Sequence, residues 1–177
     1  MRNRVAAAVL ALLREGRSQF SVAEVAERSG VHLTTVYRWW PTRLDLLSEA
    51  LTLHTASLVA PDQGSWAEDV YALAEELAKF FSDPVEIAMN ALIASSAEPE
   101  GDAVQINHYT PVMLALAEIV DRAKHKGEVA PQTDPATFMY LLVGPLFMHT
   151  VVFRSAPDPQ TVREVATALI NSFASDR

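Results

Sequence analysis

The chain has 177 residues, half of them hydrophobic, and a formal net charge of −8 at pH 7. This apolar content suffices for a sizeable core and excludes an intrinsically disordered composition. Because the chain has no cysteine, disulfide frameworks and thiolate metal sites are excluded, which fits a reducing compartment, and we expect a cytoplasmic protein. The longest apolar run, Phe138 to Phe153, is shorter than the roughly 18–20 residues of a membrane span, so no membrane partner is expected.

The charge is unevenly distributed along the chain. Residues 1–50 carry seven arginines against five acidic residues, a balance of +2. The remainder carries seven basic and seventeen acidic residues, a balance of −10, which together give the net charge of −8. A mildly basic N-terminal head on an acidic body is compatible with DNA binding through the head.

Helix signals dominate the first third of the chain. A first helix is predicted from Arg2 to Glu15, because Gly16 stops it and apolar residues recur on one face. The Ser-x-x-Glu pattern at residues 21–24 is a capping box that opens a second helix ending at Gly30. A third short helix is expected over residues 33–39, and Thr42 caps a fourth that runs to about Ala60.

Further helix starts and stops follow along the chain. A turn cluster at residues 61–65 marks a soft boundary, and a helix is predicted after it to about Phe81. Two more helices are expected to open at Asp83-Pro84 and at Asp102, the second of them ending at Gly127. Asp-Pro pairs at 134–135 and 158–159 each place a cap before a proline at the first helical position. Strand signals are weak, so the fold class is all-α, with about nine helices.

Residues 21–43 follow the plan of a helix-turn-helix. Val22, Val25 and Ala26 form the inward face of the first helix, and Val36 with Trp40 anchors the second. The outward face then carries side chains suited to base edges in the major groove, while Tyr37 and Arg43 are placed for phosphates. The residues predicted to contact DNA are Ser21, His32, Thr34, Thr35, Tyr37, Arg38, Trp39 and Arg43.

The stretch TTVYRWWPTRLDLLSEAL, residues 34–51, resembles the signature of the tetracycline-repressor (TetR) family, in its branch with Trp40-Pro41 after the recognition helix. The C-terminal segment from Asp134 to Ile170 is similar to the last two helices of the same branch. Leu33 and Trp39 depart from the family's usual polar residues, which reduces the number of polar base contacts. The resemblance implies a helix-turn-helix DNA-binding domain over residues 1–48 and a ligand-binding and dimerisation domain over residues 49–177.

The resemblance also implies that the helical body encloses a pocket for a small molecule. Aromatic and methionine side chains suit a mostly apolar ligand, although each such residue alone is more often plain core. The residues predicted to bind the ligand are Trp66, Phe80, Phe81, Met89, His108, Tyr109, Met113, Phe147 and Met148. No metal and no cofactor are expected.

The last two helices are candidates for a dimer interface. The segment from Pro135 to Arg154 is apolar nearly all round and must bury two faces, and the final helix is apolar along one face. Two such helices from each of two chains would form a four-helix contact across a two-fold axis, as the resemblance also implies.

These features favour a dimeric, ligand-responsive transcriptional regulator, expected to be a repressor that a small apolar ligand releases from a pseudo-palindromic double-stranded operator. The alternative is a monomeric helical carrier of small molecules without DNA binding, which would share the aromatic body but would not need Tyr37, Arg38 and Arg43. An enzyme is not expected, because the chain has no Gly-rich phosphate loop, HExxH or GxSxG motif.

Overall fold

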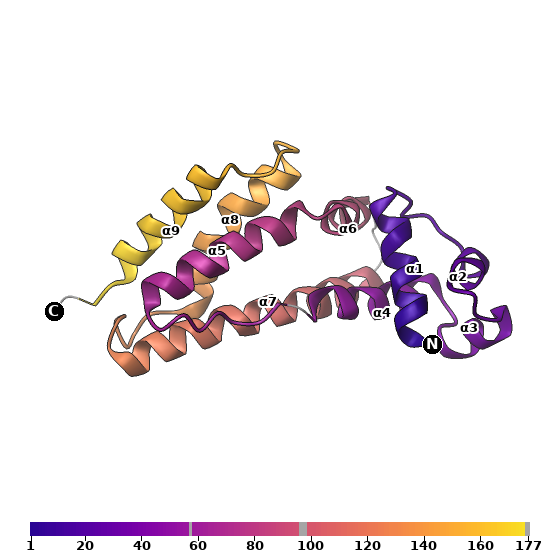
Figure 1. Cartoon of the computed structure of the whole chain (residues 1–177), viewed down its shortest axis with the longest axis horizontal. Coiled ribbons are helices and arrows are strands. Elements are labelled where there is room, and N and C mark those ends of the chain that lie inside the picture. Colours follow the sequence, from indigo (N-terminus) through magenta and orange to yellow (C-terminus); the bar gives the residue numbers. More distant parts are fainter. Residues whose placement is uncertain (57, 96–98, 176–177) are drawn as a thin grey trace. The chain divides into compact units, whose positions relative to one another are not determined.

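The computed structural model describes residues 1–56, 58–95 and 99–175, and this part of the chain folds into nine α-helices (Figure 1). The predicted all-α fold class is confirmed. Within the described residues, β-type backbone pairing consists of an isolated antiparallel bridge between Val129 and Ala174. The helices are α1 (Arg2–Arg14), α2 (Val22–Ser29), α3 (Leu33–Trp39), α4 (Arg43–Thr55), α5 (Trp66–Ser82), α6 (Pro84–Ser95), α7 (Pro99–Lys126), α8 (Pro135–Val151) and α9 (Pro159–Phe173).

Side-chain caps set the starts of several helices, as predicted. At α4 the Thr42 hydroxyl accepts the backbone N–H of Asp45 at 3.1 Å, and the Asp45 carboxylate accepts the backbone N–H of Thr42 at 2.9 Å. Asp134 and Asp158 each accept two backbone N–H groups at the starts of α8 and α9. These bonds satisfy donors that the first turn of a helix leaves without partners.

Two predicted helix bounds were wrong. Helix α4 ends at Thr55 rather than near Ala60, because the β-branched residues Thr55 and Val59 are weak helix formers. Helix α7 begins at Pro99 rather than at Asp102, since proline is favoured at the first helical position. Glu98, part of the predicted loop before this helix, lies outside the described residues.

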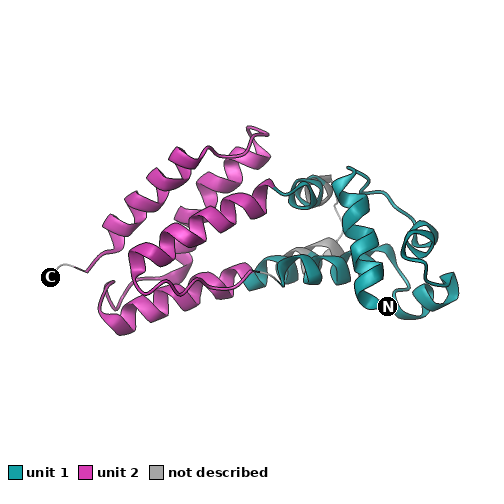
Figure 2. Ribbon diagram, in the orientation of Figure 1, with its two compact units in different colours: residues 1–57, 83–111 teal, residues 58–82, 112–177 magenta. Residues whose placement is uncertain are grey.

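The chain divides into two compact units (Figure 2). The first unit combines residues 1–57 with residues 83–111, and the second combines residues 58–82 with residues 112–177. These units are defined by packing. The predicted functional division between residues 48 and 49 stays a prediction.

The core of the first unit joins α1 to the helices around it. Val5, Val9 and Leu12 of α1 are fully buried in one cluster with Leu46 of α4. Met89 of α6 is 1% exposed in the same cluster. The predicted apolar face of the first helix is therefore confirmed as core.

The core of the second unit is built from aromatic and aliphatic residues. The rings of Trp66 and Phe138 lie 4.9 Å apart, and those of Phe81 and Phe147 lie 5.7 Å apart. Arg122 of α7 donates to the buried carboxylate of Asp69 at 2.9 Å, which ties α7 to α5. Among the described helices, none has the length and apolarity that crossing a bilayer requires.

Candidate functional site

The turn between α2 and α3 forms because its residues satisfy both helix ends. The Ser21 hydroxyl accepts the N–H of Glu24 at 3.1 Å, which is the first half of the predicted capping box. The Glu24 carboxylate pairs with Arg17 instead of completing the box. Gly30 takes φ = +63°, a left-handed backbone that glycine adopts without strain, and the chain then turns into α3.

The faces that α2 and α3 turn toward the core are those predicted. Val25 and Val36 are fully buried, and Val22, Ala26 and Trp40 are nearly so. Small and β-branched residues allow the two helices to cross closely. The buried face of α3 also determines which of its side chains point outward.

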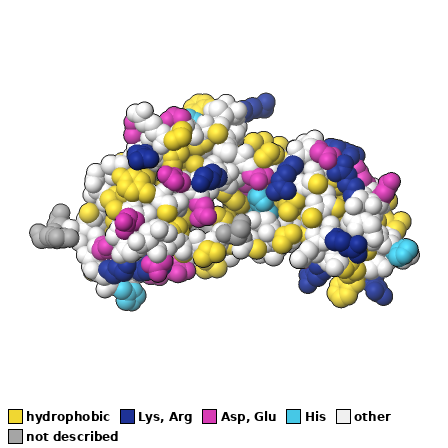
Figure 3. All heavy atoms as spheres, in the orientation of Figure 1, with side chains coloured by type: hydrophobic (Ala, Val, Ile, Leu, Met, Phe, Trp, Pro, Cys, Tyr) yellow, Lys and Arg dark blue, Asp and Glu magenta, His cyan; other side chains and the backbone are white. Residues whose placement is uncertain are grey.

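The outward face of α3 carries the residues predicted to contact DNA. His32, Thr34 and Arg38 are exposed, and Tyr37 and Trp39 are 48% and 56% exposed. Thr35 is half-buried, so it lies at the margin of this surface. Figure 3 shows basic side chains over the helices α1 to α3, with exposed apolar side chains beside them.

A contact that sequence reasoning missed holds the end of α3. The indole Nε1 of Trp40 donates to Glu49 Oε2 at 3.3 Å, and Arg2 donates to the same oxygen at 2.6 Å. Glu49 of α4 thus joins α1 to Trp40, the C-cap residue of α3. The signal in the sequence is slight, since Glu49 is one acidic residue on a leucine-rich helix.

Two of the predicted DNA contacts also have local roles. Arg43 donates from Nη1 to the Ser18 carbonyl at 2.8 Å and to Gln19 Oε1 at 3.0 Å, which fixes the segment before α2. The Ser21 hydroxyl is used as a helix cap. The predicted contacts of Arg43 and Ser21 with phosphate stay predictions.

The residues predicted to bind a ligand are divided between the two units. Met89, His108 and Tyr109 belong to the first unit. The second unit contains Trp66, Phe80, Phe81, Met113, Phe147 and Met148. Trp66, Phe80 and Phe81 are buried and Phe147 is half-buried, whereas Met113 and Met148 are about half exposed.

His108 and Tyr109 belong to a buried polar cluster centred on Glu86 of α6. His108 Nε2 lies 2.7 Å from Glu86 Oε1, and His54 Nε2 lies 3.2 Å from the same oxygen. The Tyr109 hydroxyl lies 3.3 Å from Glu86 Oε2 and 3.0 Å from Asn90 Oδ1, and either oxygen can accept its single proton. The cluster therefore links α4, α6 and α7 within the first unit.

Burial and hydrogen bonding shift the pKa values of Glu86 and Tyr109 in this cluster. Burial raises the pKa of Glu86, but hydrogen bonds from His108 and His54 outweigh it and hold the pKa below the ordinary value of 4.5. Burial and the Glu86 charge raise the pKa of Tyr109 well above its ordinary value of 10.0, so the phenol stays a donor at neutral pH. Sequence reasoning missed Glu86, although a glutamate within an apolar helix is the signal that could have found it.

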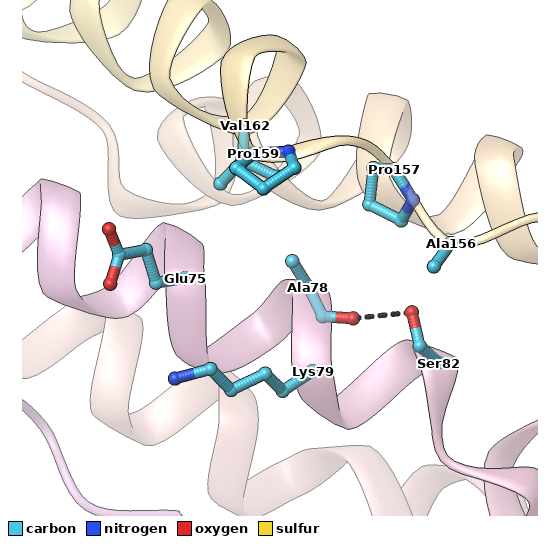
Figure 4. Close-up of a pocket in the computed structure, with 8 residues that line it drawn as sticks. All are labelled: Glu75, Ala78, Lys79, Ser82, Ala156, Pro157, Pro159 and Val162. Carbon is cyan, nitrogen blue, oxygen red and sulfur yellow. Dashed lines mark hydrogen bonds between the residues drawn. The ribbon is translucent and has the colours of Figure 1, made fainter.

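A surface pocket of about 400 Å³ lies within the second unit, between α5 and the segment that leads into α9 (Figure 4). Ala78, Pro157 and Val162 supply apolar surface, and Glu75 and Lys79 lie on the α5 side. None of the nine residues predicted to bind a ligand lines it. Sequence reasoning selected large aromatic and methionine side chains, whereas this pocket has small apolar ones.

The last two helices leave an apolar surface open in the single chain. Tyr140 is 70% exposed, and Leu141 and Met148 of the same helix are about half exposed. Val162, Ala166 and Leu169 of α9 are buried, which confirms the predicted inward face of the final helix. In the described part of the chain, no group of three or more His, Cys, Asp or Glu side chains is arranged to hold a metal ion.

Comparison with known proteins decides the family. A model of the tetracyclin repressor-like C-terminal domain matches residues 60–169, and a model of the IclR helix-turn-helix domain matches residues 4–39. The HTH-type transcriptional regulator AqdR of Rhodococcus erythropolis is 34% identical over 175 residues, which cover 97% of this chain and 84% of that protein. The chain belongs to the tetracycline-repressor-like family of helix-turn-helix transcriptional regulators.

Two further comparisons agree with this assignment, one in the class of protein and one in the fold. The HTH-type transcriptional regulator YdeS of Bacillus subtilis is 25% identical over 165 residues, which cover 92% of this chain and 82% of that protein. A TetR transcriptional regulator from Agrobacterium tumefaciens has the same fold, with a TM-score of 0.82 and 18% identity over 99% of this chain and 95% of that one. The predicted family is confirmed, and the regulator is favoured over the small-molecule carrier. The branch with Trp40-Pro41 stays a prediction.

Proposed function

We propose that this TetR-family regulator is a homodimeric repressor that binds a pseudo-palindromic operator through α3 and is released by a small apolar ligand. The observation that carries the proposal is the outward face of α3. It exposes Arg38 beside Thr34, while Val36 and Trp40 anchor the helix from behind. An arginine can pair with the O6 and N7 atoms of guanine, and a threonine can contact either a base edge or a thymine methyl group.

The DNA-binding part is assigned to residues 1–48 and its contacts to Ser21, His32, Thr34, Thr35, Tyr37, Arg38, Trp39 and Arg43. Tyr37 and Arg43 contact phosphates, and the other outward side chains of α3 face the groove, away from the buried Val36. A two-fold dimer presents two copies of α3 to major grooves about one helical turn of DNA apart, roughly 34–36 Å. The operator is therefore expected to have two related half-sites.

The dimer forms through α8 and α9 in residues 49–177. Tyr140, Leu141 and Met148 together leave a substantial apolar surface on α8, and such surfaces mark protein contacts. Gly144 lies on the same helix, and a Cβ built there meets no atom within 4 Å, so the surface has room for a close helix approach. These features support a symmetric contact between two copies of the chain.

Ligand response is assigned to the aromatic and methionine residues of the body. Mostly apolar linings with a few polar groups are typical of small-molecule sites, and His108 with Tyr109 supplies such polar groups. A ligand releases DNA only if it binds the released form more tightly than the DNA-bound form. Because its proposed partner is double-stranded DNA, we place the regulator in the cytoplasm.

Selection from random duplex DNA tests the proposal. The purified full chain is mixed with a random duplex pool at a stated salt concentration, and the bound fraction is sequenced over several rounds. Enrichment of a two-fold symmetric site supports the proposal. Absence of enrichment at low salt, from a folded and dimeric sample, would favour the carrier instead.

A further inference from the structure

Leu33 is an exposed apolar residue on the helix proposed to read DNA. It is the first residue of α3 and is 42% exposed, between the exposed His32 and Thr34. A single exposed leucine is ordinary on a protein surface and needs no explanation by itself. Its position is the informative feature, because the N-terminal residues of a recognition helix are those that contact base edges.

The geometry of α3 places Leu33 beside the centre of the outward face. Residues four apart share a face of a helix, so Thr34 and Arg38 lie together, opposite the buried Val36. Leu33 lies above Tyr37 on the adjoining flank, and both side chains are exposed. In the proposed complex Thr34 and Arg38 face the floor of the groove, and Leu33 lies at the N-terminal end of α3, the end that contacts base edges in a recognition helix.

The chemistry of the groove limits what Leu33 can contact. The leucine side chain has no hydrogen-bond donor or acceptor. Contact with a phosphate or a purine edge would therefore desolvate polar atoms of the DNA without replacing their hydrogen bonds to water. Thymine is the base that presents an apolar group in the major groove, its 5-methyl group. We infer that Leu33 contacts the 5-methyl group of one thymine in each half-site, an inference that rests on the proposed operator binding.

This contact makes Leu33 a specificity-determining residue. It favours thymine over cytosine at one position of the half-site through apolar contact rather than through charge. Because Leu33 carries no charge, its contribution does not depend on the release of counterions from DNA. Replacing it is therefore expected to relax sequence preference at that position and to leave the salt dependence of binding unchanged.

Deoxyuridine tests this contact directly, because it lacks the 5-methyl group and keeps the hydrogen-bonding groups of thymine. Each thymine of the selected duplex is replaced by deoxyuridine in both half-sites, one position at a time, and the affinity of the full chain is measured. At one position we expect a loss of about fourfold per half-site, or about fifteenfold for both, the factor that burial of one methyl group corresponds to. The Leu33→Ala chain is expected to bind the thymine and deoxyuridine duplexes equally.

Leu53→Ala is the matched control. Leu53 lies on α4, is 39% exposed, and loses the same atoms, but it is not on α3. This variant is expected to keep the full preference for thymine. Leu33→Met, which retains an apolar side chain, is expected to keep most of it, and circular dichroism with dimer mass shows that each variant is folded.

Two results would overturn the inference while leaving operator binding intact. One is equal affinity of the unaltered chain for every thymine duplex and its deoxyuridine counterpart. The other is full discrimination by Leu33→Ala. If the unaltered chain enriches no duplex at all, the proposed function fails and this contact fails with it.

Discussion

Glu86 Oε1 lies 2.7 Å from Nε2 of His108, and both side chains are buried. Removal of the carboxylate takes away the group that both imidazoles contact, because Nε2 of the largely buried His54 lies 3.2 Å from the same oxygen. We expect Glu86→Ala to lower the free energy of unfolding by about 3 kcal/mol, the range found when one member of a buried ionic pair is removed. Urea unfolding followed by circular dichroism measures it, and Glu76→Ala, which removes an exposed carboxylate of α5, is the control. A Glu86→Ala chain as stable as this control would show that the cluster is not stabilising.

The same cluster predicts how stability depends on pH. The pKa of Glu86 is lower in the folded chain than its ordinary value, so the unfolded chain binds this proton more readily. The stabilisation is therefore complete above the ordinary carboxyl pKa, near pH 4.5, and is lost as the pH falls through the lower pKa of the folded chain. Urea midpoints between pH 7 and pH 3 should fall more steeply for the unaltered chain than for Glu86→Gln. Parallel curves would contradict the assignment.

The parts of the fold that could be predicted from the sequence are those set by local chemistry. Two helix starts could be located because an aspartate precedes a proline at each, Asp134 and Asp158. Two helix stops could be located because a glycine with left-handed backbone follows each, Gly30 and Gly127. All four signals lie within four residues of the helix terminus that they set. The end of α4 was misplaced because the sequence between Thr55 and Pro61 contains no strong stop signal. The helix ends there through weak preferences that act together.

Helix capping at α4 can be tested by one substitution. Thr42→Ala removes the hydroxyl that accepts the N–H of Asp45, and the free energy of unfolding should fall by about 1 kcal/mol. Thr52→Ala is the control in the same helix, because Thr52 is exposed and its hydroxyl donates to the Ser48 carbonyl of the preceding turn rather than capping the helix. Equal effects of the two substitutions would mean that the cap does not contribute.

The contacts that could not be predicted join residues far apart in the sequence. Glu49 accepts from Arg2, 47 residues away, and Arg43 donates to the Ser18 carbonyl, 25 residues away. Nothing in the local pattern distinguishes an arginine that faces DNA from one that braces a loop. The exposure of the predicted residues on α3 could be foreseen, because the helix is short and its buried face is determined by Val36 and Trp40; their contacts with DNA stay predictions.

The proposed dimer interface predicts a change of mass. Tyr140→Arg places a charge on the exposed apolar surface of α8, where burial against a second chain would strip it of water. Light scattering should then report 19.4 kDa instead of twice that mass. Val59→Arg is the control, because Val59 is 68% exposed and lies outside α8 and α9. A dimeric Tyr140→Arg chain would place the interface elsewhere.

The proposed DNA-reading role of the outward face of α3 is tested by measuring the affinity of the Arg38→Ala chain for the selected duplex. Loss of one arginine–base pairing costs about 1–3 kcal/mol in each half-site, so the dimer should lose at least about thirtyfold in affinity. Lys79→Ala removes the same charge from α5 and should bind as the unaltered chain does. If the Arg38→Ala chain stays folded and dimeric and binds the duplex as tightly as the Lys79→Ala chain, α3 does not read DNA through Arg38.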